Sequence, residues 1–578
     1  MTSPTPALSP ELDRRARDWA ADDPDPTTRA ALERLLEDAR SGDRAAGEEL
    51  ADAFSGPLEF GTAGLRGRMG PGENRMNLAV VSRAARGLAD HLIGELGGAG
   101  TEQAPLVVIG YDARHHSQEF AECSAAIMTA AGCRVQLLER FGPTPLVAFG
   151  VRRLGADAGI VVTASHNPPA DNGYKVYLGG RAVDPDGQGV QIVPPSDARI
   201  AARIAAVGAV RDIPVANGGW ALLGEDLREE YLGTIGALVG TEGPRDVRIV
   251  HTAMHGVGHE PAVAALRRAG FTEVHPVPKQ ADPDPDFPTV AFPNPEEKGA
   301  IDLALELART VEADVVIAND PDADRCAAAV VDPHQEAWRM LSGDELGVLL
   351  GDHLIRRHAL RGVVANSVVS SRWLSRVAEA NSLEAATTLT GFKWIARTPG
   401  IGFGYEEAIG YCVLPDVVRD KDGLSTALLV AEMAAEAKAA GTSLVDRLDD
   451  LAREHGLYAT DQLSLRVDAL PERDVMMTRL REQPPTTLAG SAITEVQDLA
   501  QGSANGLPPT DGVQLSTADD SRVIVRPSGT EPKLKCYIEV HEEVEEHADF
   551  ADLGRVRHEA AENLARITEE MRAALTGV

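Results

Sequence analysis

The chain is poor in cysteine, and the few cysteines it has are scattered. Its 578 residues include five cysteines, an odd number, and none of them forms a CxxC pair. Spacing of this kind indicates neither a thiolate zinc site nor a disulfide framework. We therefore expect free, buried thiols of the kind found in a reducing cytoplasm.

Long apolar runs and a secretory leader are also missing. No stretch approaches the roughly 18 uninterrupted apolar residues that a membrane-spanning helix requires. Residues 1–6 lack the charged and apolar regions of a secretory signal. The sequence thus predicts a cytoplasmic protein with no membrane partner.

Positive charge is scarce as well. Lysine and arginine total 56 against 88 aspartates and glutamates, which gives a formal net charge of −32. An excess this acidic argues against a nucleic-acid-binding surface and against docking on anionic lipid. Phosphorylated small molecules remain suitable ligands, because they need only a local basic pocket.

The length of the chain predicts three or four domains.

Apolar runs alternate with helical patterns through most of the chain. After an amphipathic helical segment at 10–55, strands are predicted at 106–112, 134–138 and 159–162, with a helix at 118–131. The rhythm restarts twice, with strands at 246–251, 314–318 and 362–366 and helices at 260–268 and 424–440. Such βαβ alternation predicts mostly parallel sheets with helices on their faces.

The C-terminal part of the chain has a different pattern. After a predicted linker near Gly456, the βα alternation becomes sparse, and a long helical pattern starts near Leu553. This change indicates a separate α+β domain.

The first motif with chemical potential is the run Thr163-Ala164-Ser165-His166-Asn167-Pro168. It places a serine hydroxyl directly after the buried strand 159–162. Ser165 is a candidate nucleophile at this position. Taken alone, the motif favours an ordinary turn whose polar side chains satisfy backbone groups, and the other two motifs reverse that preference.

The second motif contains aspartates at alternating positions, Asp320, Asp322 and Asp324, after the strand 314–318. Three carboxylates in one tight loop suit Mg²⁺, which prefers oxygen ligands. The alternatives are a solvated acidic turn or half of a calcium loop. An EF-hand needs glycine at the sixth position and glutamate at the twelfth, where this chain has Arg325 and Val331.

The third motif is the turn Arg526-Pro527-Ser528-Gly529-Thr530, which is followed by two lysines. Backbone N–H groups, hydroxyls and a guanidinium in such a turn are suited to binding a phosphate. An ordinary Pro-Ser-Gly turn is the alternative.

Together these motifs resemble those of the α-D-phosphohexomutase superfamily, which includes the phosphoglucomutases and phosphomannomutases. Five segments match in the family's order over nearly the whole chain: 60–67, 163–168, 320–325, 404–408 and 526–530. The resemblance implies an α/β protein with three related domains of mixed or parallel sheets and a smaller C-terminal α+β domain, all around one central cleft. The expected boundaries are 1–240, 241–343, 344–457 and 458–578.

The resemblance also implies an isomerase. A phosphate carried on Ser165 is passed to a sugar phosphate, and a bisphosphosugar then returns its other phosphate, so that 1- and 6-phosphates interconvert. Mg²⁺ is expected to bind Asp320, Asp322 and Asp324 together with an oxygen on Ser165. The expected small-molecule partners are sugar phosphates, with a sugar 1,6-bisphosphate as activator.

The same resemblance assigns roles to further residues. Arg325 is expected to neutralise the transferring group, and Lys421 to act in acid–base chemistry or phosphate contact. His166 and Lys175 are both candidates for proton transfer, and the sequence does not decide between them. The expected substrate-binding residues are Arg66, Thr390, Glu406, Arg526, Ser528, Gly529, Thr530 and Lys535.

Two departures from the family pattern affect the choice of sugar. Ala408 stands where many phosphoglucomutases have serine, and Lys535 stands where many relatives have arginine. The run 405–411 is similar to a branch that contains hexose mutases, phosphopentomutases and a sugar bisphosphate synthase. We expect a glucose or mannose phosphate as substrate, with a pentose phosphate or bisphosphate synthesis as the alternatives.

Two other functional classes use similar residues. A haloacid-type phosphatase combines clustered aspartates with Mg²⁺, but its nucleophile is an aspartate in a DxD motif near an N-terminal strand. A non-catalytic sugar-phosphate binding protein is expected to lack Ser165 or an aspartate of the loop, and this chain has all four. Both classes are therefore less favoured than a mutase.

Overall fold

The structure is a computed structural model that describes residues 8–467, 470–502, 506–527 and 533–577. Contacts within the chain divide it into two compact units. The first unit comprises Met1–Cys326 and Leu414–Ala431, and the second comprises Ala327–Val413 and Glu432–Val578.

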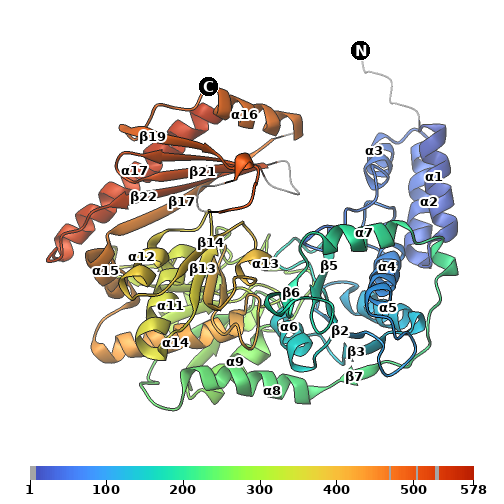
Figure 1. Ribbon diagram of the computed structural model, residues 1–578, viewed down its shortest axis with the longest axis horizontal. Helices are drawn as coiled ribbons and strands as arrows, with labels where there is room; N and C mark the ends of the chain where they lie inside the picture. Colours follow the sequence, from blue (N-terminus) through green and yellow to red (C-terminus); the bar gives the residue numbers. More distant parts are fainter. Residues whose placement is uncertain (1–7, 468–469, 503–505, 528–532, 578) are drawn as a thin grey trace. The chain divides into compact units, whose positions relative to one another are not determined.

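The first unit begins with three helices, α1 (Pro10–Asp22), α2 (Pro26–Arg40) and α3 (Arg44–Ala53) (Figure 1). Each helix starts after a residue whose side chain accepts a hydrogen bond from the first turn, namely Ser9, Asp25 and Asp43. Four residues of this segment are expected from the sequence to pack in the core: Trp19, Leu32 and Leu36 are buried, and Leu35 is half-buried against the same core. The amphipathic prediction for this segment is confirmed.

The first sheet has the strand order β1-β5-β4-β2-β3-β7, with β6 beside β5. Its bounds are β1 (Leu65–Arg68), β2 (Leu106–Tyr111), β3 (Arg134–Leu138), β4 (Ala158–Val162), β5 (Asp171–Leu178), β6 (Val190–Gln191) and β7 (Ala221–Leu223). Strands β2, β3, β4 and β7 run parallel, as predicted. Strand β5 is antiparallel to β4 because the chain returns to the sheet directly after the Ser165 loop.

Helices cover both faces of this sheet (Figure 1). Successive side chains of a strand point to opposite faces. Val107 and Ile109 of β2 pack in the core that contains α4 (Leu78–Leu96) and α5 (Ser117–Ala131). Gly110 faces Val147 of α6 (Thr144–Arg153) so closely that a Cβ atom would lie 2.4 Å from the valine. Helices α7 (Ser196–Ala205) and α8 (Glu225–Gly236) follow.

The first unit also contains three parallel strands in the order β10-β8-β9. They are β8 (Ile249–Thr252), β9 (Val274–Pro276) and β10 (Val315–Ala318), with helices α9 (His259–Arg268) and α10 (Asp302–Thr310). Strand β8 begins at Ile249 rather than at the predicted 246. The reason is a turn in which Val247 N–H bonds to the carbonyl of Arg245, whose guanidinium also holds the carbonyl of Ala269.

The second unit contains a hairpin, β11 (Ala327–Asp332) and β12 (Ala337–Met340), and a sheet in the order β14-β13-β15-β16. Strands β13 (Val363–Ser367), β14 (Ala385–Thr388) and β15 (Ile401–Glu406) are parallel, and β16 (Gly410–Cys412) is antiparallel. The helices are α11 (Gly343–His358), α12 (Trp373–Ala380), α13 (Phe392–Ile395) and α15 (Leu444–His455). Helix α14 (Gly423–Ala440) starts in the first unit and ends in the second.

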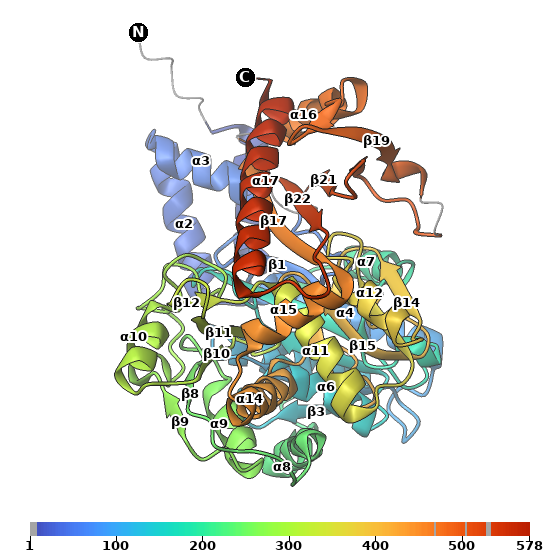
Figure 2. The same ribbon diagram turned by 90° about the vertical axis from the view of Figure 1, so that its left-hand side faces the viewer.

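The C-terminal part of the second unit is an antiparallel sheet in the order β17-β22-β21-β20-β19-β18. Its strands are β17 (Leu457–Arg466), β18 (Thr487–Leu488), β19 (Ser491–Asp498), β20 (Val513–Thr517), β21 (Arg522–Pro527) and β22 (Lys533–Glu542). Helices α16 (Leu470–Glu482) and α17 (Phe550–Thr576) accompany it, and Figure 2 shows α17 running along β17 and β22. Strand β17 starts directly after Gly456, the predicted linker position.

The predicted fold class is confirmed: the α/β sheets are parallel or mixed, and the last sheet is antiparallel with long helices. The four domain boundaries stay a prediction. All five cysteines are free, and all but Cys123 are buried. Within the described ranges, every helix is either too short or too polar to cross a membrane.

Candidate active site

The Ser165 loop leaves the carboxyl end of β4 and is held in a strained conformation. Ser165 has a φ of 52°, in the left-handed region, which costs a non-glycine residue roughly 1–2 kcal/mol. The guanidinium of Arg114 offsets this cost by donating hydrogen bonds to the carbonyls of Ser165, Asn167 and Pro168. Asp112, at the carboxyl end of the neighbouring strand β2, forms an ion pair with Arg114. The serine is therefore fixed by the sheet edge beneath it.

The aspartate loop follows β10, at a strand's carboxyl end. Asp320, Asp322 and Asp324 are buried, and one oxygen of each lies within 4.8 Å of the others. Two glycines allow neighbouring backbone to approach this loop. A Cβ on Gly256 would lie 2.3 Å from Pro321 Cα, and one on Gly423 would lie 2.3 Å from the Arg325 carbonyl oxygen.

The two loops meet at a direct hydrogen bond. Ser165 Oγ donates to Asp320 Oδ2 at 2.9 Å, although the residues are far apart in the chain. Burial, and then repulsion from Asp322 and Asp324, raise the pKa of Asp320 well above its usual value. Without a metal, this carboxyl group therefore holds its proton more tightly than an exposed aspartate.

Lys175 supplies positive charge to the other two aspartates. It lies on β5 opposite Val161 of β4, and its Nζ is 2.7 Å from Asp322 Oδ2 and 2.9 Å from Asp324 Oδ2. Burial would lower the pKa of Lys175, but the two carboxylates outweigh burial and raise it. Thr144 Oγ1 also donates to Asp322 Oδ2 at 2.7 Å. Lys175 therefore stays protonated in this arrangement.

Lys421 and Arg325 complete the charge balance. Lys421 Nζ lies 3.3 Å from Asp324 Oδ2, and Arg325 Nε lies 3.9 Å from Asp324 Oδ1 and 4.0 Å from Asp320 Oδ2. Three cationic side chains thus surround three carboxyl groups. The Lys421 loop is anchored by its flanking aspartates, which accept hydrogen bonds from tyrosine hydroxyls at 2.8 Å: Asp420 from Tyr177 and Asp422 from Tyr231.

His166 directly follows the serine in the chain, with Nδ1 3.4 Å from Ser165 Oγ. Burial, followed by the positive charges of Arg325 and Arg66, lowers the pKa of His166 well below its usual value. The imidazole is therefore neutral near pH 7 and able to accept a proton. Arg66 itself is exposed, and it donates to Asn167 Oδ1 at 3.3 Å.

The aspartate loop fits a hard divalent cation. Asp322 Oδ1 and Asp324 Oδ1 are buried and have no hydrogen-bond partner among the described residues. Unsatisfied buried carboxylate oxygens are costly, and a metal ion would satisfy them. An all-oxygen donor set suits Mg²⁺ better than a softer ion.

The expected sugar-binding residues of the second unit lie at the carboxyl edge of its parallel sheet. Glu406 ends β15 and is buried, and Thr390 follows β14. The next residue, Glu407, accepts hydrogen bonds from Ser367 and Ser370. The loop is packed so tightly that a Cβ on Gly343 would lie 1.8 Å from the Glu407 carbonyl oxygen.

The expected phosphate-binding residues are described only in part. Arg526 of β21 and Lys535 of β22 are register partners across the antiparallel pair. Lys535 Nζ lies 5.6 Å from the centre of the Tyr537 ring. The predicted contacts Ser528, Gly529 and Thr530 lie outside the described residues.

Two residues that hold the loops of the site, Arg114 and Thr144, are not among those predicted from the sequence. The position of Arg114 could have been recognised from the sequence, because it follows β2 at the sheet edge where ligand-binding loops gather. No sequence pattern points to Thr144, because its partner Asp322 lies far along the chain and only the fold brings the two residues together.

Sequence models of one family match four successive segments of this chain. They are the phosphoglucomutase/phosphomannomutase α/β/α domains I, II and III, at residues 57–210, 229–333 and 342–454, and the C-terminal domain of the same family at 482–553. The chain belongs to the phosphoglucomutase/phosphomannomutase family. It is a phosphosugar mutase, an isomerase that works by intramolecular phosphoryl transfer.

Individual relatives of this mutase have different names. A Haemophilus influenzae protein named probable phosphomannomutase is 42% identical over 82% of this chain and 95% of its own length. Human phosphopentomutase is 34% identical over 92% of this chain and 91% of its own. Staphylococcus epidermidis phosphoglucomutase is 33% identical over 85% of this chain and 92% of its own length.

A solved structure shares the fold of the mutase. A phosphoglucomutase/phosphomannomutase family protein from Burkholderia thailandensis superposes with a TM-score of 0.64 at 20% identity, over 89% of this chain and 97% of its own. The family resemblance predicted from the five motifs is confirmed.

Proposed function

We propose that this mutase interconverts the 1- and 6-phosphates of glucose or mannose through a phosphate carried on Ser165 and a bisphosphosugar intermediate. The observation that supports this most strongly is the 2.9 Å contact between Ser165 Oγ and Asp320 within a buried aspartate triad. Phosphoryl transfer depends on positioning and on neutralisation of charge. A strained, immobilised serine beside carboxylates and cations offers both.

Mg²⁺ is the metal we propose for this site. Asp320, Asp322 and Asp324 would hold it together with a phosphate oxygen on Ser165, and it would neutralise charge on the transferring group. A phosphoserine carries about −1.5 to −2 charges near pH 7. The triad is already balanced by Lys175, Lys421 and Arg325, so Mg²⁺ and the phosphate together leave the site near neutrality.

The geometry suggests how the two candidates for proton transfer differ. His166 is neutral and has Nδ1 near the serine oxygen, so it is suited to accept the proton of the attacking sugar hydroxyl. Lys175 is protonated and bound to two carboxylates. We propose that Lys175 and Arg325 stabilise charge, while Lys421 contacts phosphate or assists proton transfer.

Substrate binding is proposed for the sugar- and phosphate-recognition residues that the sequence motifs predict. Glu406 would accept hydrogen bonds from neighbouring sugar hydroxyls, and Thr390, in the loop after β14, would also contact the substrate. The distal phosphate would bind the 526–530 turn and Lys535, and Arg66 would contact the phosphate near Ser165. A sugar 1,6-bisphosphate would activate the enzyme, because it restores the phosphate on Ser165 after an intermediate has escaped.

A phosphopentomutase is the second candidate. Ala408 removes a hydroxyl that many phosphoglucomutases have beside Glu406, so one hydrogen bond to a hexose is missing. Relatives named phosphopentomutase are 34% identical over 92% of this chain. These two observations make a pentose 1-phosphate the main competitor.

Comparing kcat/KM for glucose, mannose and ribose 1-phosphates tests the choice of sugar. We expect a hexose to be preferred. A hundredfold preference for ribose, about 2.7 kcal/mol in transition-state binding, would overturn that choice. Following a radiolabelled 1-phosphate also separates a mutase from a phosphatase, which releases free phosphate, and from a binding protein, which releases nothing.

A further inference from the structure

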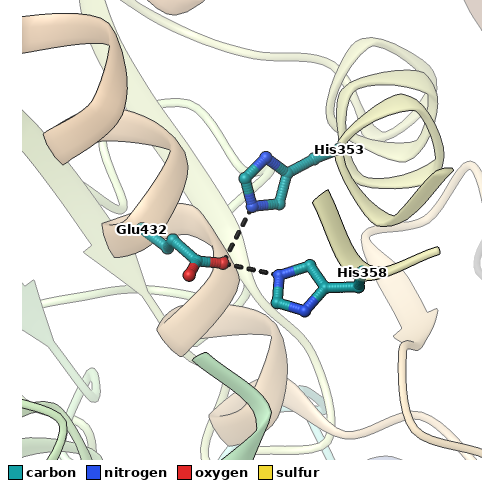
Figure 3. Close-up of side chains that lie close together, drawn as sticks. All are labelled: His353, His358 and Glu432. Carbon is teal, nitrogen blue, oxygen red and sulfur yellow. Dashed lines mark hydrogen bonds and ion pairs between the residues drawn. The ribbon is translucent and has the colours of Figure 1, made fainter. Parts of the chain in front are cut away.

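A second cluster of metal-ligating side chains lies in the second unit, away from every motif of the mutase reaction. His353 and His358 come from α11, and Glu432 comes from α14 (Figure 3). Both imidazoles point at the same carboxylate oxygen: His353 Nε2 is 2.9 Å and His358 Nε2 is 2.7 Å from Glu432 Oε2. His353 and Glu432 are buried.

Both histidines lie in the last turns of α11, which ends at His358. Residues five apart in a regular α-helix point about 140° away from each other, yet here both imidazoles reach one carboxylate oxygen. Directly after His358 the helix closes with a bond from Ala359 N–H to the carbonyl of Leu354, five residues earlier, and Ala359 is left-handed with a φ of 48°.

The donor set selects a class of metal. Two imidazole nitrogens and one carboxylate are typical ligands of Zn²⁺ and similar transition-metal ions, whereas Mg²⁺ and Ca²⁺ prefer oxygen alone. The three ligand atoms lie within 4.8 Å of one another. With metal–ligand bonds of about 2.0–2.2 Å, the ligands of a tetrahedral ion lie about 3.3–3.6 Å apart. The two histidine–glutamate contacts, at 2.9 and 2.7 Å, therefore need to open by only about 0.4–0.9 Å to admit the ion.

The surroundings match those of a metal site. The other ring nitrogen of His353, Nδ1, faces Glu436 Oε2 at 4.0 Å, and a carboxylate in that position orients a metal-bound imidazole. His358 is partly exposed, so an ion and a water ligand have a path to the cluster. A cavity of about 260 Å³ is lined by His353 and Glu436 on the adjoining surface.

The carboxylate is charged before any metal arrives. Burial would raise the pKa of Glu432, but the hydrogen bonds from His353 and His358 outweigh burial and lower it to about 2. Glu432 is therefore an anion at neutral pH, and no proton has to leave it when a cation binds.

We propose that His353, His358 and Glu432 form a binding site for one Zn²⁺-class ion, which links α11 to the part of α14 that carries Glu432. On binding, each imidazole gives up the Nε2 proton that it donates to Glu432 Oε2, and this proton moves to Nδ1 of a neutral ring or to solvent. The Nε2 lone pair then faces the ion, and the remaining ring proton lies on Nδ1. The Nδ1–H of His353 then faces Glu436. The coordination bonds replace the two hydrogen bonds to Glu432 Oε2.

The test uses the full-length protein in excess Mg²⁺ and adds one equivalent of Cu²⁺ as a spectroscopic probe. Electron paramagnetic resonance reports nitrogen ligands through superhyperfine splitting, and the aspartate triad offers only oxygen. We expect splitting from two nitrogens in the wild type and from at most one, that of His353, in His358→Gln. Oxygen-only coordination of the first equivalent in the wild type would overturn the proposal.

A matched control separates this cluster from a chance surface pair. His558 and Glu562 form an exposed histidine–glutamate pair with Nε2 and Oε1 3.4 Å apart. We expect His558→Gln to bind Zn²⁺ like the wild type and His358→Gln to bind it about 100-fold more weakly. Equal affinity of the wild type and His358→Gln would contradict the site.

A second variant guards against misfolding. Glu432→Gln keeps the size of the side chain and an oxygen that accepts from both histidines. It should match the wild type in circular dichroism and lose the rise in melting temperature that Zn²⁺ gives the wild type. An unchanged Zn²⁺-dependent rise in Glu432→Gln would exclude the carboxylate as a ligand. A wild type whose melting temperature does not respond to Zn²⁺ would exclude the site.

Discussion

The aspartate loop of the first unit and the His353–His358–Glu432 cluster of the second are both sets of three metal-ligating groups, buried except for the partly exposed His358. Their charges are balanced in opposite ways. The loop brings three like charges together and needs Lys175, Lys421 and Arg325 around it. The cluster pairs one carboxylate with two proton donors of its own. Three carboxyl groups depend on neighbouring cations to balance their charge. A carboxylate with two imidazoles instead receives its hydrogen bonds from members of the same cluster.

The pKa values show this difference most directly. Repulsion adds to burial at Asp320 and raises its pKa, while hydrogen bonds overcome burial at Glu432 and lower its pKa. The aspartate loop, with carboxylate oxygens that lack hydrogen-bond partners, can bind a metal together with a phosphate, which suits catalysis. The histidine–glutamate cluster, with its carboxylate already hydrogen-bonded, suits a role in stability.

Replacing the nucleophile should have the largest effect and separate the two sites functionally. We expect Ser165→Ala to lower kcat/KM by about 10⁴-fold or more, because no phosphate can be carried by alanine. His358→Gln should stay near the wild type in the same assay. Intact-mass analysis should show added phosphate on active wild type only; active enzyme that never carries it would contradict the role of Ser165.

Removing one carboxylate from the loop should damage catalysis more than folding. We expect Asp322→Asn to lower Mg²⁺-supported activity by about 10²–10³-fold, because the metal loses a charged ligand. Lys175 keeps its contact with Asp324, so the free energy of unfolding should fall by only about 1–3 kcal/mol.

Metal titration of activity and urea unfolding check the two parts of this prediction separately. Full activity of Asp322→Asn after exhaustive chelation would contradict the metal assignment altogether.

Phosphorylation should couple to one metal site and leave the other alone. Because the aspartate triad is already neutralised, Mg²⁺ should bind about tenfold or more tightly when Ser165 carries phosphate. Zn²⁺ affinity at the histidine cluster should not change. Calorimetric titration of the phosphorylated enzyme and of Ser165→Ala measures the Mg²⁺ and Zn²⁺ affinities of each protein. Equal Mg²⁺ affinities of the two proteins would contradict the proposed coupling of phosphorylation to the aspartate triad.

The smallest expected effect is on stability at low pH. The pKa of Glu432 is about 2 in the folded protein and about 4.5 when it is unperturbed. Between these values the unfolded chain binds the proton more readily, so this contribution is complete above pH 4.5 and is lost as the pH falls towards 2. The difference in melting temperature between the wild type and Glu432→Gln should therefore shrink by a few degrees as the pH falls.

Asp344 is an internal control of opposite sign on the same helix, α11. Burial raises its pKa to about 7, although it accepts hydrogen bonds from Ser371 N–H and Tyr405 Oη. The folded state then binds the proton more tightly, so this contribution is present at low pH and declines as the pH rises from about 4 to 7. Asp344→Asn should flatten this decline of stability with rising pH. If the stability that Asp344 contributes is instead lost as the pH falls, as expected for Glu432, the raised pKa of Asp344 would be contradicted.

Much of the fold was predictable because strands and helices have strong local patterns. Strand β3 has the predicted bounds, and β2 and β4 differ from prediction by a single residue at one end. The antiparallel direction of β5 was not foreseen, since it depends on where the chain returns after the Ser165 loop. The later start of β8 reflects the side-chain contacts of Arg245, which no periodicity reveals.

The sequence alone determined which groups lie side by side along the chain: a serine after one buried strand, and three aspartates at alternating positions after another. Those features depend on neighbours a few residues apart. The tertiary structure decided the Ser165–Asp320 contact, the pairing of Lys175 with Asp322 and Asp324, and the convergence of His353 and His358 on Glu432. Each of these joins distant segments, and burial then sets which groups hold a proton, because desolvation acts only once the chain has folded.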